Sequence, residues 1–121
     1  MPCLFCELSK NKSVFLHENE SYYVIPDKFP ASKGHSLIIL KKHEESFFDL
    51  QNGELKDLKD ALYNTKILLD EKFHPDAYNL GINEGAAAGR TIHHFHAHLI
   101  PRYVSEPAKG GIEALLKNAE K

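Results

Sequence analysis

Several features that would set this chain apart from an ordinary soluble globular domain are missing from its 121 residues. It has no apolar segment long enough to span a bilayer, and its first residues lack the positive stretch and apolar run of a secretory signal. We therefore expect a cytoplasmic protein with no membrane partner. Repeats, low-complexity stretches and linkers are also missing, so residues 1–121 are expected to form a single domain.

The net charge is small and cysteines are few. The formal net charge is -2 at pH 7, with 26% charged and 42% hydrophobic residues, which gives no electrostatic case for nucleic-acid binding. A small-molecule substrate is expected instead. The two cysteines, Cys3 and Cys6, have Cys-x-x-Cys spacing, which in a reducing compartment indicates metal or redox chemistry more readily than a structural disulfide.

Histidine is the residue type that stands out among those present. Of eight histidines, His94, His96 and His98 occupy every second position, and an apolar residue follows each one. This alternation predicts a half-buried strand with the three imidazoles on one face, about 6.6 Å apart. Such a row can place a nucleophile and its helpers along a substrate, or it can hold a metal. His93 is expected on the opposite face, as a packing or surface residue.

The remaining pattern predicts an α+β domain with a mainly antiparallel sheet of about five strands. Strands are expected over residues 14–17, 22–25, 35–40, 77–83 and 92–100, the first two forming a hairpin. Leucines at helical spacing predict one long helix over 54–72, with Asn52 as its N-cap, and a short helix is expected after Gly110-Gly111. Because the sheet leaves an edge that needs protection, a homodimer is expected.

A loop of small residues, 83–91, leads into the histidine strand. Backbone amides can approach an anion closely where side chains are small, and Arg90 and Thr91 add a positive charge and a hydroxyl donor. The loop differs from a P-loop because it leads into a strand rather than a helix. It is therefore interpreted as a phosphate-binding loop, with an ordinary hairpin loop as the alternative.

The segment 83–102, in which Gly89-x-Thr91 leads into the three alternating histidines, resembles the histidine triad (HIT) family of nucleotide hydrolases and transferases. Ile25-Pro26-Asp27 and the run 34–43 extend the resemblance over most of the chain. The resemblance implies a HIT-like fold and a phosphohydrolase that cleaves at the α-phosphate of a purine nucleotide, either a nucleoside phosphoramidate or a dinucleoside polyphosphate. It further implies a covalent nucleotidyl-histidine intermediate and release of a nucleoside monophosphate, while transfer to an acceptor other than water stays open.

The same resemblance implies roles for individual residues. His96 would be the nucleophile, and His98 would contact the phosphate or pass a proton to the leaving group. A neutral imidazole attacks when its second nitrogen is held as a donor, commonly by a neighbouring carbonyl. The other substrate-binding residues implied are Leu4, Phe5 and Ile25 at the base, Asp27 at the ribose, and Asn83, Gly89 and Thr91 at the phosphates.

Arg90 departs from the family pattern, which usually has Gln at this position. We include it among the substrate-binding residues because a guanidinium there can strengthen the binding of a polyphosphate or stabilise a charged leaving group. The alternative is that its side chain points into solvent.

A second group of candidate functional residues, with side chains that bind metals, consists of Cys3, Cys6, His43 and His94. A Cys₂His₂ set suits tetrahedral zinc and leaves no open coordination position, so the predicted cofactor is a structural zinc. Zinc-bearing HIT relatives use a similar set, which includes the first histidine of the triad. Free thiols or a redox pair are the alternatives.

Two rival functions remain at this point. One is a hydrolase in which a catalytic zinc on the histidine row activates water. The other is a zinc-stapled nucleotide-binding module with little turnover.

Overall fold

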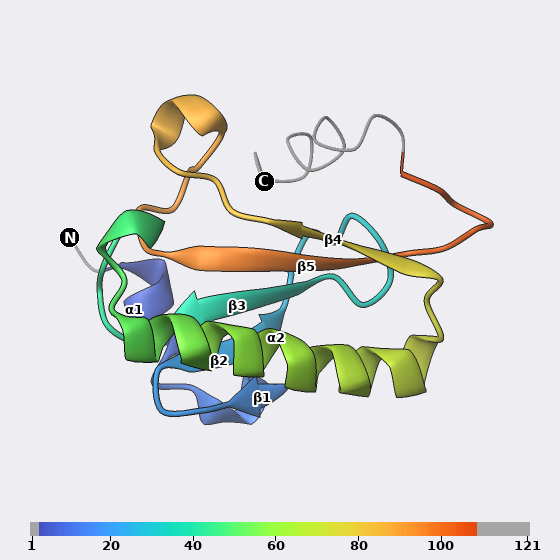
Figure 1. Cartoon of the computed structure of the whole chain (residues 1–121), viewed down its shortest axis with the longest axis horizontal. Coiled ribbons are helices and arrows are strands. Elements are labelled where there is room, and N and C mark those ends of the chain that lie inside the picture. The colour runs from blue at the N-terminus through green and yellow to red at the C-terminus, as the bar shows by residue number, and fades with distance from the viewer. Residues whose placement is uncertain (1–2, 109–121) are drawn as a thin grey trace.

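A five-stranded antiparallel sheet with one long helix on one face forms the body of the protein, as shown by a computed structural model that describes residues 3–108 (Figure 1). The spatial order of the strands is β1-β2-β3-β5-β4. They are β1 (His17–Glu18), β2 (Tyr22–Pro26), β3 (Ser36–Leu40), β4 (Ala77–Gly81) and β5 (His96–Arg102). The helices are α1 (Leu4–Leu8) and α2 (Asn52–Phe73), with 3-10 turns η1 (Lys12–Val14), η2 (Phe47–Asp49) and η3 (Ala86–Ala88). The expected α+β class and sheet are confirmed; the helix expected after Gly110-Gly111 lies outside the described residues.

Side chains on the two faces of the sheet enter two separate cores. The larger core lies beneath α2, where Leu58, Ala61 and Leu69 pack on the sheet. The smaller core lies on the other face around Phe5 of α1. Successive residues of a strand point to opposite faces, so β2 and β3 contribute side chains to both cores. The strand residues under α2 are Tyr22, Val24, Ile38, Leu40, Ala97 and Leu99, and those facing α1 are Tyr23, Ile25, Leu37 and Ile39.

Helix α2 begins and ends close to the positions expected, but its N-cap is Gln51 rather than Asn52. The Gln51 side chain accepts from the third helical N–H, and the backbone N–H of Gln51 donates to Oε1 of Glu54 at 2.8 Å. This reciprocal pair satisfies two N–H groups that a helix start otherwise leaves without partners. At the other end, His74 adopts a left-handed conformation with φ 51° and terminates the helix before Pro75.

The strands differ from expectation at both ends of the chain. Val14 belongs to η1, so the first hairpin strand is only His17–Glu18. The histidine strand was expected over 92–100, but β5 starts at His96 and passes through Pro101. Proline fits there because β3 begins at Ser36, opposite Leu99, so among the described strands only β4 lies beside Pro101. Helix α1 was not predicted.

Gly34 anchors the loop between β2 and β3. Its φ is +95°, a conformation that other L-residues rarely adopt, and a Cβ atom there would lie 3.0 Å from both Phe73 and Pro101. The loop therefore packs against the end of α2 and against β5. This contact fixes the two residues that flank the loop, Asp27 and His35, over the α1 face of the sheet.

Within residues 3–108, no helix combines the length and the apolar character that crossing a membrane requires.

Candidate active site and metal centre

The histidine row lies on the α1 face of the sheet. His96 and His98 alternate along β5 with Ala97 and Leu99, whose side chains are in the core beneath α2, and the two imidazole centroids are 5.2 Å apart. His94 lies just before β5 and is fully buried. The ring of Phe5 packs edge-on against His94 and His96, at centroid distances of 5.8 and 4.9 Å. Three histidines therefore share one face, as the alternation predicts, but they have different surroundings.

His96 is held as a neutral imidazole with one free nitrogen. Its Nδ1 lies 2.8 Å from the carbonyl oxygen of His94, and because a carbonyl only accepts, Nδ1 must carry the proton. The lone pair is then on Nε2. Burial lowers the pKa of His96, and the positive charge of Arg90 lowers this pKa further. His96 is thus a neutral imidazole at neutral pH, with the lone pair that a nucleophile requires.

A chain of hydrogen bonds sets the tautomer of His98. The backbone N–H of Ala31 donates to Nδ1 of His35 at 3.0 Å, so the proton of His35 is on Nε2. That Nε2–H lies 3.0 Å from Nδ1 of His98 and 3.2 Å from Oδ2 of Asp27. His98 therefore accepts at Nδ1 and carries its own proton on Nε2.

The Nε2–H of His98 is a buried donor, and none of the residues 3–108 accepts from it. Burial lowers the pKa of His98 to about 3, and the neighbouring His96 and His35 contribute to this shift. The imidazole is therefore neutral, and its ring centroid lies 5.2 Å from that of His96. A buried donor without a partner costs free energy, which an anionic ligand oxygen at this position would offset.

His35 is a site residue that sequence reasoning missed. It lies in the Gly34-His35 dipeptide that the resemblance covers, but there it was interpreted only as part of a central strand. Its role depends on contacts with Ala31 and His98, and His98 lies 63 residues away in the chain.

The four predicted metal ligands come together in one cluster. Nδ1 of His94 lies 3.3 Å from Sγ of Cys3, 3.6 Å from Sγ of Cys6 and 3.1 Å from Nδ1 of His43. Sγ of Cys6 is also 3.3 Å from Nδ1 of His43. Ligands bound to a tetrahedral zinc lie roughly 3.3 to 3.8 Å from one another, so the cluster fits this ion.

The local structure orients these ligands before any metal binds. Helix α1 places Cys3 at its N-cap and Cys6 one turn later, which brings the two thiols together. His94 donates from Nε2 to the carbonyl oxygen of Leu40 at 2.6 Å, so its lone pair is on Nδ1, facing the cysteines. A carbonyl partner of this kind is the usual way in which a protein fixes the tautomer of a histidine ligand.

A second group of metal-ligating side chains, Asp27, His35 and His98, also lies within 4.8 Å. It does not fit a metal, because the Ala31 N–H occupies Nδ1 of His35 and leaves the proton on Nε2, the atom that would have to coordinate. This group is instead a hydrogen-bonded chain that ends at His98.

The residues expected to contact the base and the ribose differ in how far they are buried. Phe5 and Ile25 are buried on the α1 face, whereas Leu4 is 54% exposed. Asp27 lies directly after β2, where its Oδ1 accepts from the N–H of Phe29 at 2.9 Å. The Asp27 carboxylate is therefore already fixed on the His35 side.

The expected phosphate-binding residues lie on the connection between β4 and β5. Asn83 and Gly89 are partly buried, Thr91 is exposed, and η3 forms a single turn between them. Gly85 and Gly89 both have positive φ, at 93° and 101°, which permits this compact turn.

Arg90 does not point into solvent, so that alternative is wrong. Its side chain is only 8% exposed, and it donates from Nη1 to the carbonyl oxygen of Glu45 at 2.7 Å and from Nη2 to the Glu45 carboxylate at 3.2 Å. Its Nε is buried, and no residue of the described part of the chain accepts from it. The buried Nε–H of the guanidinium thus remains for a ligand.

The HIT domain model matches residues 9–105 of the chain. A 16.1 kDa HIT-like protein of Mycoplasma pneumoniae is 33% identical over 103 residues, covering 84% of this chain and 72% of the relative. The chain therefore belongs to the HIT domain family. Another relative, adenylylsulfatase HINT3 of Arabidopsis thaliana, is 33% identical over 102 residues, which is 83% of this chain and 52% of that protein.

Solved structures agree with this assignment. A HIT family member from Bacillus subtilis has a TM-score of 0.79 at 29% identity, over 93% of this chain and 78% of that one. A zinc-bound histidine triad family protein from Mycobacterium smegmatis has a TM-score of 0.77 at 25% identity, over 99% of this chain and 91% of that one. The Cys3, Cys6, His43 and His94 cluster is consistent with a zinc-bound HIT protein of this kind.

The buried neutral His98 makes stability dependent on pH. Its pKa is about 3 in the folded protein and about 6.5 when unfolded, so below pH 6.5 the unfolded chain binds the extra proton. The His98 ring faces His96, His35 and Asp27. Its contribution to the free energy of unfolding is complete above pH 6.5 and is lost as the pH falls towards 3. In this range we expect the free energy of unfolding of the wild type to fall by up to about 1.4 kcal/mol more per pH unit than that of His98→Gln. Urea unfolding between pH 7 and 4 measures this difference, and parallel curves would contradict a His98 that stays neutral in the folded protein over this range.

Proposed function

We propose that this HIT family protein is a nucleotide phosphohydrolase that cleaves at the α-phosphate through a covalent nucleotidyl-His96 intermediate. Its substrates are purine nucleoside phosphoramidates or dinucleoside polyphosphates, and its product is a nucleoside monophosphate. One observation carries the proposal: the His94 carbonyl holds the proton of His96 on Nδ1, which leaves a lone pair on Nε2 of a ring whose centroid lies 5.2 Å from that of His98.

The reaction would proceed in two displacements. Nε2 of His96 attacks the α-phosphorus, a P–N bond forms, and the bond from phosphorus to the leaving group breaks with its electron pair on the leaving group. His98 donates its Nε2–H to a phosphate oxygen, which stabilises the charge that develops in the transition state. Water then attacks the same phosphorus and gives up a proton, which balances the proton that an amine leaving group takes up. The P–N bond breaks, and the monophosphate and the neutral imidazole are released.

The His35 chain supports this role for His98. If His98 were the other tautomer, its Nε2 would present a lone pair to the anionic phosphate and repel it. The Ala31 N–H and Nε2–H of His35 make that tautomer unfavourable. His35 is therefore a positioning residue. Adenylylsulfatase HINT3 provides a parallel, because its name describes release of an adenylyl group from an acidic leaving group.

Two rival functions fit the site less well. A catalytic zinc on the histidine row would need lone pairs from neighbouring histidines, but Nδ1 of His94 faces the cysteines and His96 uses Nδ1 to donate. A binding module with little turnover needs no nucleophile of fixed tautomer. The geometry of His96 therefore favours an enzyme.

We also propose that Cys3, Cys6, His43 and His94 hold one structural zinc. When bound, the ion would supply only crosslinking, because the four protein ligands complete a tetrahedron. The chain's own residues carry its effect to the active site: His94 is a ligand through Nδ1, and its carbonyl fixes the proton of His96.

The third proposal is a homodimer through the edge strand β4. Within residues 3–108, strand β4 pairs only with β5, and its outer edge adjoins an apolar groove shared with α2. Leu80 and Tyr63 are 57% and 62% exposed there. A second copy fits this edge because antiparallel pairing across a two-fold axis is self-complementary.

Replacing the nucleophile tests the enzyme directly. His96→Ala should lower kcat/KM by about 10³-fold or more, since removing a nucleophile removes the covalent path, while nucleotide affinity changes little. Monophosphate release from adenosine phosphoramidate and diadenosine polyphosphate measures the effect, and mass spectrometry of quenched wild type should detect the nucleotidyl adduct. His93→Ala, the exposed neighbour, is the matched control. Near-normal turnover by His96→Ala would refute covalent catalysis at this residue.

Metal analysis tests the structural zinc. The purified protein should carry about one zinc per chain, and Cys6→Ser should lose it and become less stable by several kcal/mol, because the binding energy of a closed site is folding energy. Glu7→Gln on the same helix is the control and should keep both zinc and stability. Chelation that abolishes activity without lowering the unfolding temperature would instead support a catalytic metal.

Arg90 is tested by comparing leaving groups. If its buried Nε contacts the phosphate chain, Arg90→Gln should lower kcat/KM about ten- to a hundredfold on dinucleoside polyphosphates and less on phosphoramidates, whose leaving group is an amine. Glu45→Gln, which weakens the ion pair and keeps the guanidinium, separates loss of the arginine from a disturbed loop. Equal losses on both substrate classes would indicate loop disruption, and no loss would remove Arg90 from the substrate site.

Oligomeric state tests the β4 interface. Leu80→Asp should convert the dimer to a monomer, because a carboxylate would be buried without a partner in the new interface. Val14→Asp, on η1 near the opposite edge of the sheet, should stay dimeric. Light scattering coupled to size-exclusion chromatography gives both masses. A monomeric wild type, or a dimeric Leu80→Asp variant, contradicts the proposal.

A further inference from the structure

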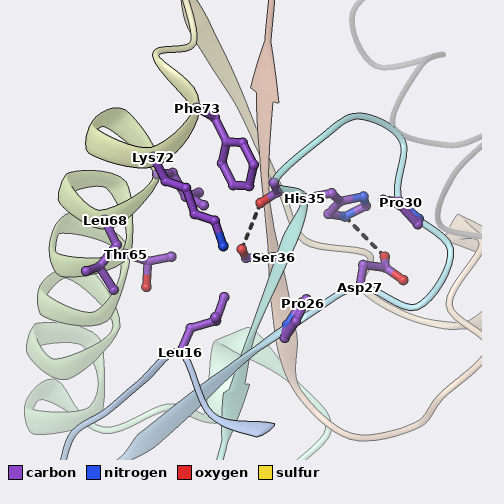
Figure 2. Close-up of a pocket in the computed structure, with 12 residues that line it drawn as sticks. Leu16, Pro26, Asp27, Pro30, His35, Ser36, Thr65, Leu68, Lys72 and Phe73 are labelled. Carbon is purple, nitrogen blue, oxygen red and sulfur yellow. Dashed lines mark hydrogen bonds and ion pairs between the residues drawn. The ribbon is translucent and has the colours of Figure 1, made fainter.

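A cavity of about 210 Å³ lies between the C-terminal half of α2 and the ends of β2 and β3 (Figure 2). Its walls are mostly apolar and include Leu16, Pro26, Leu68, Leu69 and Phe73. It is distinct from the site around His96, because neither His96 nor His98 lines it.

Side chains alternate between the two faces of β2 and β3, and this alternation places the cavity on the opposite face of the sheet from His96 and His98. Pro26 and Ser36 are paired across β2 and β3 and line the cavity on the α2 side. Their neighbours Asp27 and His35 also border it, but these two side chains point away from α2 and towards one another (Figure 2). One layer of backbone therefore separates the cavity from the hydrogen-bonded chain that leads to His98.

The polar groups of the cavity restrict what can bind there. Ser36 donates its hydroxyl proton to the carbonyl oxygen of Gly34 at 2.9 Å, and Thr65 donates to that of Ala61 at 2.7 Å. Neither hydroxyl has a proton left to donate to a ligand. The interior therefore offers no hydroxyl donor to a ligand, which disfavours a carboxylate or another acceptor group at that end.

Lys72 supplies a positive charge at the cavity. Its side chain extends from α2 towards Ser36, and its ammonium lies 5.4 Å from the ring centroid of Phe73 (Figure 2). No Asp or Glu within residues 3–108 forms an ion pair with it, whereas Lys66, one and a half turns earlier on the helix, pairs with Asp70 at 2.7 Å. The cavity thus combines an apolar interior with one cation that has no acidic partner in the described chain.

We propose that this cavity binds an amphipathic anion, a carboxylate on a short apolar chain or ring, with the apolar part between α2 and the sheet and the carboxylate at Lys72. An apolar cavity of about 150 Å³ holds a molecule of benzene size, so this one accommodates about six to nine apolar non-hydrogen atoms.

Octanoate is the probe, and 1-octanol, which has the same chain without the charge, is its counterpart. Titration of the full-length protein, followed by amide chemical shifts, should give saturable octanoate binding at millimolar concentrations or below, with the largest shifts in residues 26–36 and 65–73. No catalytic assay is involved, so the outcome is independent of the proposed hydrolase. Shifts that are absent, or that centre on Phe5 and His96, would overturn the proposal.

Two pairs of variants locate the ligand. Leu68→Trp should block the cavity and lower octanoate affinity about tenfold or more, whereas Ile67→Trp, which is equally exposed at 44% but does not line it, should not. Lys72→Gln should weaken octanoate about two- to fivefold, as expected for a solvent-exposed ion pair, and leave octanol unchanged. Lys56→Gln, an exposed lysine near the start of the helix, is the charge control.

The outcomes separate clearly. Octanoate affinity that is unchanged in both Leu68→Trp and Lys72→Gln overturns the site. An equal loss in Ile67→Trp shows that the ligand binds elsewhere on the surface of α2, which also overturns it. Circular dichroism confirms that each variant is folded before its affinity is compared.

Discussion

The buried imidazole of His94 is the point on which both functional clusters depend. Its Nε2–H is committed to the carbonyl oxygen of Leu40, so its lone pair faces Cys3, Cys6 and His43. Its own carbonyl accepts from Nδ1 of His96. One residue therefore orients a metal ligand with its side chain and the proposed nucleophile with its backbone. A displaced His94 would disturb the cysteine cluster and the tautomer of His96 together.

Tautomers, rather than charges, organise this site. His94, His96 and His98 are buried to different degrees, and burial lowers the pKa of each, so all three are neutral at neutral pH. A neutral imidazole has one donor and one acceptor, and the neighbouring backbone decides which nitrogen has which role. The carbonyls of Leu40 and His94 fix the first two rings, and the Ala31 amide fixes the third through His35. Chemistry at each ring is thus set by backbone geometry.

The two faces of the sheet have separate tasks. The α1 face carries the metal cluster, the histidines and Phe5, while the α2 face carries the larger core and the cavity near Lys72. The loop between β2 and β3 belongs to both faces, because Gly34 packs against Phe73 while His35 contacts His98. Any change in packing at the end of α2 can therefore reach His98 through this one loop.

The sequence alone determined the strand that carries the histidines, their common face, the long helix and the α+β class, because alternation and helical spacing are local properties of the chain. It also identified Cys3, Cys6, His43 and His94 as a possible ligand set. Sequence reasoning missed the role of His35, the Glu45 partner of Arg90 and the Gln51 cap. It also missed α1 and the passage of β5 through Pro101. The contacts of His35 and Arg90 join residues more than 40 positions apart, and no local pattern records which segments meet. Only the tertiary structure decided the tautomers, since each depends on which backbone group lies within hydrogen-bond distance of a ring nitrogen.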